Sequence, residues 1–94
     1  MTRYYVPFTH NSPSAVDIKG HRLVILASDP KELADNSNVF GNDEIREFVF
    51  EKNEEPAVLA DIATQAKGGV VVAPPGISVS FMLSSLQRDL PWVH

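Results

Sequence analysis

Two turns in this sequence carry the residues best suited to binding a small ligand. Each turn follows a short apolar run, 22–27 or 70–73, of the kind typical of a buried strand. In open α/β sheets, ligands bind beyond the carboxyl ends of parallel strands, so the two turns share one crevice if the runs are parallel neighbours. The second turn also leads into a helix, whose free N-terminal amides attract an anion. The candidate ligand-binding residues are Ser28, Asp29, Gly76, Ser78 and Ser80.

Both turns also have a plain structural role. Asp29 precedes Pro30, and an acceptor side chain before a first-turn proline is typical of a helix N-cap. Ser78 is equally suited to cap the helix that follows the rigid Pro-Pro-Gly turn. A phosphate-binding loop of the Walker type needs further glycines and a Lys before the Ser, and this turn has neither. Helix capping is the expected role, and a ligand site is the alternative.

Other catalytic and metal-binding patterns are missing from the sequence. The chain has no cysteine, which excludes disulfides and thiolate metal sites. His10, His21 and His94 lack the spacing of metal ligands, so three exposed histidines are expected. The sequence contains no nucleophile elbow and no dinucleotide-binding glycine motif. We expect no metal and no cofactor, and no residue is predicted to be catalytic.

The net charge of −4 is concentrated in one segment. Residues 43–55 hold six acidic side chains against Arg46 and Lys52, and the rest of the chain is balanced. An exposed strand edge followed by a helix start accounts for such a segment, and a surface for a basic partner is the alternative. No basic stripe is present to neutralise phosphates, which argues against nucleic acid as a partner. The apolar runs are too short to cross a bilayer, so we expect no membrane association and a cytoplasmic location.

The hydrophobic pattern predicts a single α/β domain over residues 1–94, with the element order β-β-β-α-β-α-β-α. The run 15–27 is typical of an opening β-hairpin that turns at Gly20-His21, and strands and helices alternate after it. This order favours a mixed sheet with a partly parallel core. Pro7 cannot donate to a ladder, which places it on an edge strand or at a strand end. The predicted strands are 3–8, 15–19, 22–27, 45–51 and 70–73, and the predicted helices begin at residues 30, 54 and 78.

The predicted elements differ in how clearly the pattern defines them. The run 45–51 also fits one face of a helix, but Phe-Val-Phe favours a strand. The helix 54–66 is expected to pack through Val58, Leu59 and Ile62, and to stop in a left-handed conformation at Gly68-Gly69. The last helix, 78–90, is expected to bury one apolar face. That face consists of Val79, Met82, Leu83, Leu86 and Leu90.

Aromatic residues gather near the two ends of the sequence. Tyr4, Tyr5 and Trp92 are the candidate interface residues, because large aromatic side chains are enriched at protein interfaces. Trp92 serves equally well as a cap on the chain's own core. A domain this small, with no disulfide, has few other ways to protect apolar surface than association with a partner. We therefore expect a homodimer or other homo-oligomer, formed through the hairpin edge or the C-terminal tail.

These observations favour one function and leave one alternative. We expect a small, non-enzymatic binding or protein-interaction module that self-associates, with a second protein as a further candidate partner. The alternative is a small enzyme or enzyme subunit that acts on an anionic metabolite in the crevice near Asp29 and Ser78.

Overall fold

The computed structural model describes residues 1–88. In this part of the chain it shows a small α/β fold in which the predicted elements occur in the predicted order, with the short elements β2 and α2 in addition. The strands are β1 (Thr2–Thr9), β2 (Ser12–Pro13), β3 (Val16–Ile18), β4 (His21–Leu26), β5 (Glu44–Phe50) and β6 (Gly69–Val72). The helices are α1 (Pro30–Ala34), α2 (Ser37–Phe40), the 3-10 turn η1 (Lys52–Glu54), α3 (Glu55–Ala66) and α4 (Val79–Arg88).

The strands form two three-stranded sheets. One sheet has the order β2-β1-β5 and is antiparallel throughout. The other has the order β3-β4-β6, in which β4 runs antiparallel to β3 and parallel to β6. Tyr5 and Ala27 exchange two backbone hydrogen bonds, of 2.8 and 3.1 Å, which join β1 to the end of β4. The parallel β4–β6 pair confirms the prediction of a partly parallel core.

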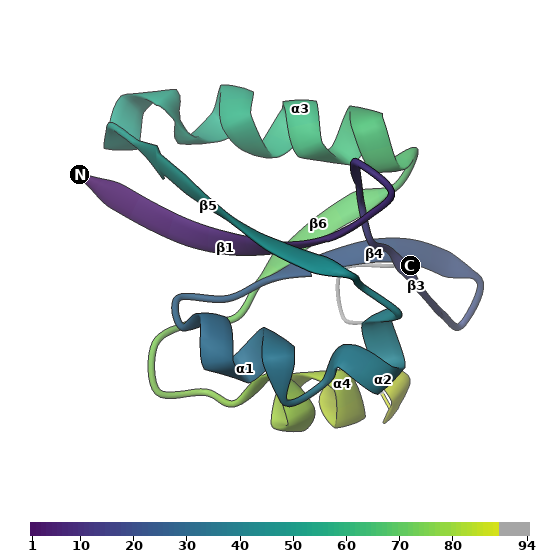
Figure 1. Ribbon diagram of the computed structural model, residues 1–94. Helices are drawn as coiled ribbons and strands as arrows, with labels where there is room; N and C mark the ends of the chain where they lie inside the picture. The colour runs from purple at the N-terminus through teal and green to yellow at the C-terminus, as the bar shows by residue number, and fades with distance from the viewer. Residues whose placement is uncertain (89–94) are drawn as a thin grey trace.

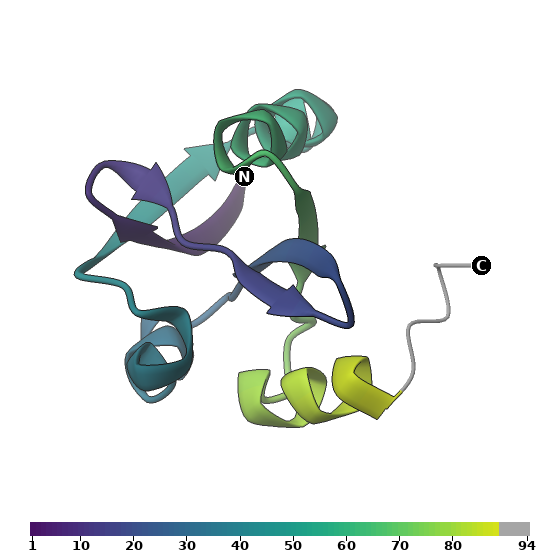
Figure 2. The same ribbon diagram turned by 90° about the vertical axis from the view of Figure 1, so that its right-hand side faces the viewer.

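Helices cover both faces of the strands. In Figures 1 and 2, α3 lies on one side of the strands, and α1, α2 and α4 lie on the other. Val24 and Leu26 of β4 pack with Ile62 of α3. Leu23 and Ile25 belong to the core on the opposite face, with residues of α1, α2 and α4. β4 is thus apolar on both faces because both of its faces are buried, as the sequence predicts.

The hairpin β3–β4 turns one residue earlier than predicted. Its turn residues are Lys19 and Gly20, with φ of 52° and 82°, and His21 already begins β4. Two consecutive left-handed residues are the geometry of a tight hairpin turn whose twist matches the flanking strands. Gly20 adopts this conformation without steric cost, since it has no Cβ.

Pro7 lies within a sheet, and the prediction of an edge strand is wrong. β1 is the central strand of β2-β1-β5. The Pro7 carbonyl accepts a hydrogen bond of 2.7 Å from the Ser14 N–H. In an extended chain the nitrogen of a residue faces the same side as its carbonyl, so the Pro7 nitrogen lies between the Tyr5–Ala27 pair and β2. Pro7, which has no N–H, therefore lies where the neighbour of β1 on this side changes from the end of β4 to β2.

The segment between α1 and β5 contains an element that the sequence did not predict. It contains the short helix α2, which places Phe40 in the core and ends at Gly41, with φ of 64°. The predicted strand 45–51 is confirmed, with bounds shifted by one residue. The acidic segment 43–55 forms this strand and the start of α3, in agreement with its expected structural role.

The helix α3 packs on the predicted face. Ile62 is only 1% exposed, and Val58 and Leu59 are half-buried against the same core. The left-handed residue after α3 is Lys67, with φ of 56°, and not a glycine.

Gly68 is needed at the end of α3 for a different reason. A Cβ on Gly68 would lie 2.3 Å from the backbone oxygen of Arg22 in β4. The glycine therefore permits the backbone between α3 and β6 to approach β4 closely.

The last strand and helix follow the predicted order. β6 is an edge strand of its sheet and is only half-buried, so the prediction of a buried strand is wrong. Val79, Leu83 and Leu86 of α4 are buried, as its apolar face predicts. Leu90, Trp92 and the C-terminal tail lie outside the described residues. Within residues 1–88, no helix is both long enough and apolar enough to cross a membrane.

Candidate functional site

The turns after β4 and β6 meet in one crevice, as the strand-end rule predicts. β4 and β6 are parallel neighbours, so their carboxyl ends lie at the same edge of the sheet. The crevice between them has a volume of about 250 Å³. Four of the five candidate ligand-binding residues line it, namely Ser28, Asp29, Gly76 and Ser78. A ligand in this crevice stays a prediction.

Ser80 does not line the crevice. Its Oγ donates a hydrogen bond of 3.0 Å to Oδ1 of Asn36, which precedes α2. This bond ties the first turn of α4 to the segment between α1 and α2. Ser80 faces this neighbouring segment because it lies two residues beyond Ser78, and residues two apart lie on different sides of a helix.

Glu32 is the residue of the crevice that the sequence analysis missed. Its Oε2 accepts a hydrogen bond of 2.9 Å from the backbone N–H of Val79, the first residue of α4. Ser78 Oγ accepts from the Phe81 N–H at 3.0 Å, which confirms Ser78 as a helix cap. Two of the N-terminal amides of α4, those of Val79 and Phe81, thus already bond to side chains of this chain. No local signal in the sequence marks this contact, since 47 residues separate Glu32 from Val79.

The charges of the crevice are unsuited to an anion. Asp29 caps α1, and its Oδ1 accepts from the Lys31 N–H at 2.9 Å. Asp29 and Glu32 both line the crevice, and none of its described lining residues is basic. A phosphate or carboxylate entering here meets two carboxylates and amides that are already bonded.

The two candidate interface tyrosines are held by glutamates of the same chain. The Tyr4 hydroxyl donates to Glu55 Oε1 at 2.7 Å, and the Tyr5 hydroxyl donates to Glu47 Oε2 at 3.0 Å. The bond to Glu55, together with burial and the negative charge of that carboxylate, raises the pKa of Tyr4 to about 12. The bond to Glu47 raises the pKa of Tyr5 in the same way. Both rings are half-buried, and Trp92 lies outside the described residues.

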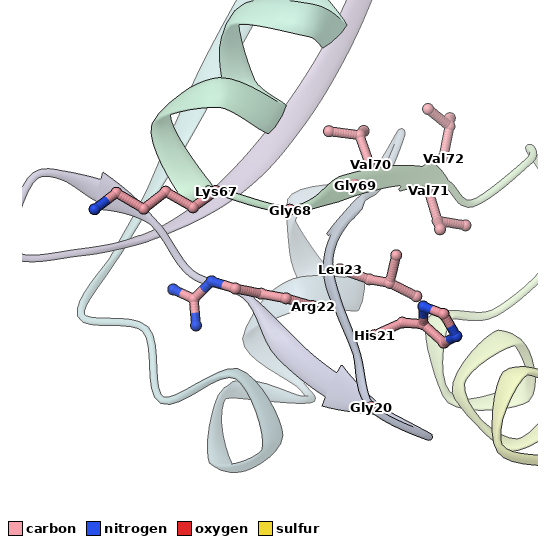
Figure 3. A pocket seen from close by; sticks show the side chains of 10 residues that line it. All are labelled: Gly20, His21, Arg22, Leu23, Lys67, Gly68, Gly69, Val70, Val71 and Val72. Atoms are coloured by element: carbon pink, nitrogen blue, oxygen red, sulfur yellow. The ribbon is translucent and has the colours of Figure 1, made fainter.

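A larger hollow lies beside β6, at the other end of the β4–β6 pair. This hollow, here called the β6 groove, has a volume of about 660 Å³ and is lined by residues 20–23 and 67–72. Figure 3 shows Val70, Val71 and Val72 along one part of the groove, with Lys67 and Arg22 directed away from them. Arg22 Nε donates to the carbonyl of Ala66 at 2.6 Å, which fixes its side chain at the end of α3.

The outer edge of β6 carries unpaired backbone groups. The Ala73 N–H donates to the Leu26 carbonyl at 2.8 Å, so the backbone of Ala73 faces β4. Successive residues of a strand point their backbone groups to opposite edges, which directs those of Val70 and Val72 away from β4. Within residues 1–88, no strand pairs with this edge. Two N–H donors and two carbonyl acceptors are therefore presented at the outer edge of β6, on the two residues, Val70 and Val72, that also line the β6 groove.

The edge strands β3 and β5 are protected by charge, and the remaining edge strand, β2, is only two residues long and contains Pro13. On β3, the residue whose backbone faces outward is Asp17, which is exposed. On β5, Glu47 faces outward and pairs with Arg3 at 3.3 Å. Charged residues on an edge discourage pairing with another chain, because their desolvation is costly. β6 contains only glycine and valine, and it lacks this protection.

Comparison with known proteins finds no relative of this chain, since no family model, no curated protein and no solved structure matches it.

Proposed function

We propose that this chain is a non-enzymatic protein-interaction module that binds by strand addition at the open edge of β6. One observation carries the proposal: among residues 1–88, no strand pairs with the outward backbone groups of Val70 and Val72, and their edge has no charge and no proline. Such an edge is a ready template for another strand, and strand addition is a recurring mode of protein recognition.

We further propose that the module self-associates, with the β6 strand of a second copy as its partner. In an antiparallel two-fold pair, Val70 of one copy faces Val72 of the other, and Val72 faces Val70. All four outward backbone groups of each copy then bond, which gives four hydrogen bonds between the copies. This contact is closed by its symmetry, so it produces a dimer and not a fibre.

The charges of the chain are compatible with this pairing. Lys67 lies two residues before β6, and antiparallel pairing places it beside the Pro74-Pro75 end of the other copy. The two copies of Lys67 are thus at opposite ends of the contact. Each backbone hydrogen bond contributes about 0.5–1.5 kcal/mol net, and association costs about 4 kcal/mol or more in lost freedom. Four such bonds contribute about 2–6 kcal/mol together and roughly offset that cost, so the dimer also needs the burial of valine side chains along the edge, at about 25 cal/mol per Å² of apolar surface. With both contributions we expect a weak dimer that forms at high micromolar concentration.

Sedimentation equilibrium of two proline variants tests the proposal. Val72→Pro removes an N–H that points away from β4, so it blocks strand addition without breaking the β4–β6 pair. Val49→Pro is the matched control, because Val49 faces the open edge of β5 and is 43% exposed. We expect Val72→Pro to weaken the dimer at least tenfold, and Val49→Pro to leave it unchanged.

Two results would reject the proposed surface. A monomer mass for the unmodified chain up to roughly 1 mM rejects the proposed self-association, because the dimer is expected to form below that concentration. A dimer that is weakened by Val49→Pro and not by Val72→Pro places the interface on β5. Circular dichroism of each variant establishes that it is folded before its mass is interpreted.

A further inference from the structure

We infer that the β6 groove selects an extended segment of another protein that carries acidic residues at its ends. This inference rests on the proposed function, because it uses the same open edge of β6. It specifies the chemistry of a partner other than a second copy of this chain.

Charge complementarity is the basis of the inference. The groove lining contains Arg22 and Lys67 and no acidic residue. Among residues 1–88, neither of these cations forms an ion pair. The net charge of −4 comes from the segment 43–55, and the groove lies outside that segment.

The positions of the two cations suit the flanks of a partner strand. Lys67 and Arg22 lie at the end of the groove where β6 begins, and Figure 3 shows both side chains extending away from the valines. A strand paired with Val70 and Val72 places its terminal residues beside this end. Carboxylates there gain attraction to the two cations, while the middle of the strand bonds to the β6 backbone.

A second copy does not supply these carboxylates. In the two-fold pair, the residues nearest Lys67 belong to the uncharged Pro74-Pro75-Gly76 turn of the other copy. The carboxylates of Asp29 and Glu32 in the crevice at that turn already accept hydrogen bonds from the Lys31 and Val79 amides. The dimer thus satisfies the backbone of the edge and leaves the cations without an acidic partner. A strand flanked by acidic residues bonds to the edge backbone and also supplies carboxylates to the two cations, so we expect it to displace the second copy.

Lys67 is the better cation for a test. Arg22 bonds to Ala66 and stands opposite Asp17 in the β3–β4 register, so its replacement would disturb the fold as well as the groove. Lys67 is exposed, and its side chain has no hydrogen bond among the described residues. Lys67→Glu reverses the charge at the end of the β6 groove where β6 begins. Lys52→Glu is the matched control, because Lys52 lies in the acidic segment 43–55 and does not line the groove.

The experiment is a titration of the full chain, followed by amide chemical shifts at low salt. The probe is the blocked peptide Glu-Glu-Val-Thr-Val-Thr-Glu-Glu, and the control probe carries Lys at all four Glu positions. Acids at both ends make the result independent of strand direction. We expect shifts at Val70 and Val72, tighter binding of the acidic peptide, and a loss of about three- to tenfold in its affinity with Lys67→Glu but not with Lys52→Glu.

The outcomes separate this inference from the proposed function. The inference of an acidic partner is overturned if the two peptides bind equally, or if the chemical shifts of the groove residues depend only on protein concentration. Neither result contradicts the proposed β6 dimer. Peptide binding that persists unchanged in Val72→Pro overturns the inference as well, because the strand edge is then not the binding element. If Val72→Pro changes neither peptide binding nor dimerisation, the proposed function fails too.

Discussion

The carboxylate of Glu32 caps the first residue of α4 from a different helix. Glu32 Oε2 accepts the hydrogen bond of the Val79 N–H at 2.9 Å, across 47 residues of sequence. A negative charge at a helix N-terminus is stabilising, and the bond satisfies one of the free amides of α4. Glu32 thereby fixes α4 against α1 and occupies the place that the alternative role of this turn would give to an anionic ligand.

Replacement of Glu32 should destabilise the fold. Glu32→Ala leaves the Val79 amide without its acceptor, and we expect a loss of about 1–2 kcal/mol in the free energy of unfolding. Glu32→Gln keeps an acceptor oxygen and should recover part of this loss. Urea denaturation measures both variants, and a loss below about 0.5 kcal/mol for Glu32→Ala would show that the contact contributes little to stability.

Truncation of Ile62 tests the core beneath α3. Ile62 is 1% exposed and packs with residues of β1 and β4, so Ile62→Ala should cost about 2–5 kcal/mol. Gln65→Ala on the exposed side of the same helix is the control and should change stability by less than about 0.5 kcal/mol. Similar losses for the two variants would mean that α3 does not bury this face.

The close approach at Gly68 makes a separate prediction. A Cβ at this position would lie 2.3 Å from the Arg22 backbone oxygen, which cannot move without displacing β4. Gly68→Ala should therefore cost about 1–3 kcal/mol, the usual range for overpacking. Gly69→Ala is the matched control and should cost less, because its Cβ would meet only Cδ2 of the Leu23 side chain, at 3.1 Å. Urea denaturation measures both, and an unaltered midpoint for Gly68→Ala would contradict the close approach.

The hydrogen bond between Tyr4 and Glu55 makes stability fall at high pH. The pKa of Tyr4 is raised from 10.0 to about 12 in the folded chain, so the folded state holds this proton more tightly than the unfolded state. The contribution of Tyr4 is complete below pH 10 and is lost as the pH rises toward about 12. Tyr4→Phe should flatten this fall. Denaturation midpoints across this pH range measure it, and equal slopes for the two proteins would refute the assignment.

Local patterns predicted the elements of this fold because those elements depend on local alternation. The apolar residues of β4 alternate between two cores, and a short run that is apolar on both faces is typical of a strand covered on both sides. Ile62 was predicted to be buried for a similar reason, since it recurs at helical spacing with Val58 and Leu59. Asp29 and Ser78 were recognised as caps because capping depends on residues within one turn.

The features that the sequence did not predict depend on tertiary contacts. Glu32 reaches Val79 only because α1 and α4 pack together. Lys67 takes the left-handed position because Gly68 is required beside Arg22, a contact between distant segments. The apolar run of β6 is typical of a buried strand, and only the strand order shows that it is an edge.

Hydrogen exchange at two backbone amides tests the proposed strand addition most directly. The Val70 and Val72 N–H groups face the open edge of β6, so both should exchange rapidly in dilute solution. Pairing with a second copy protects them, and we expect their exchange to slow as protein concentration rises, while that of Glu47 on β5 stays constant. Exchange at Val70 and Val72 that is independent of concentration, in a sample that sedimentation shows to be dimeric, would contradict the β6 interface.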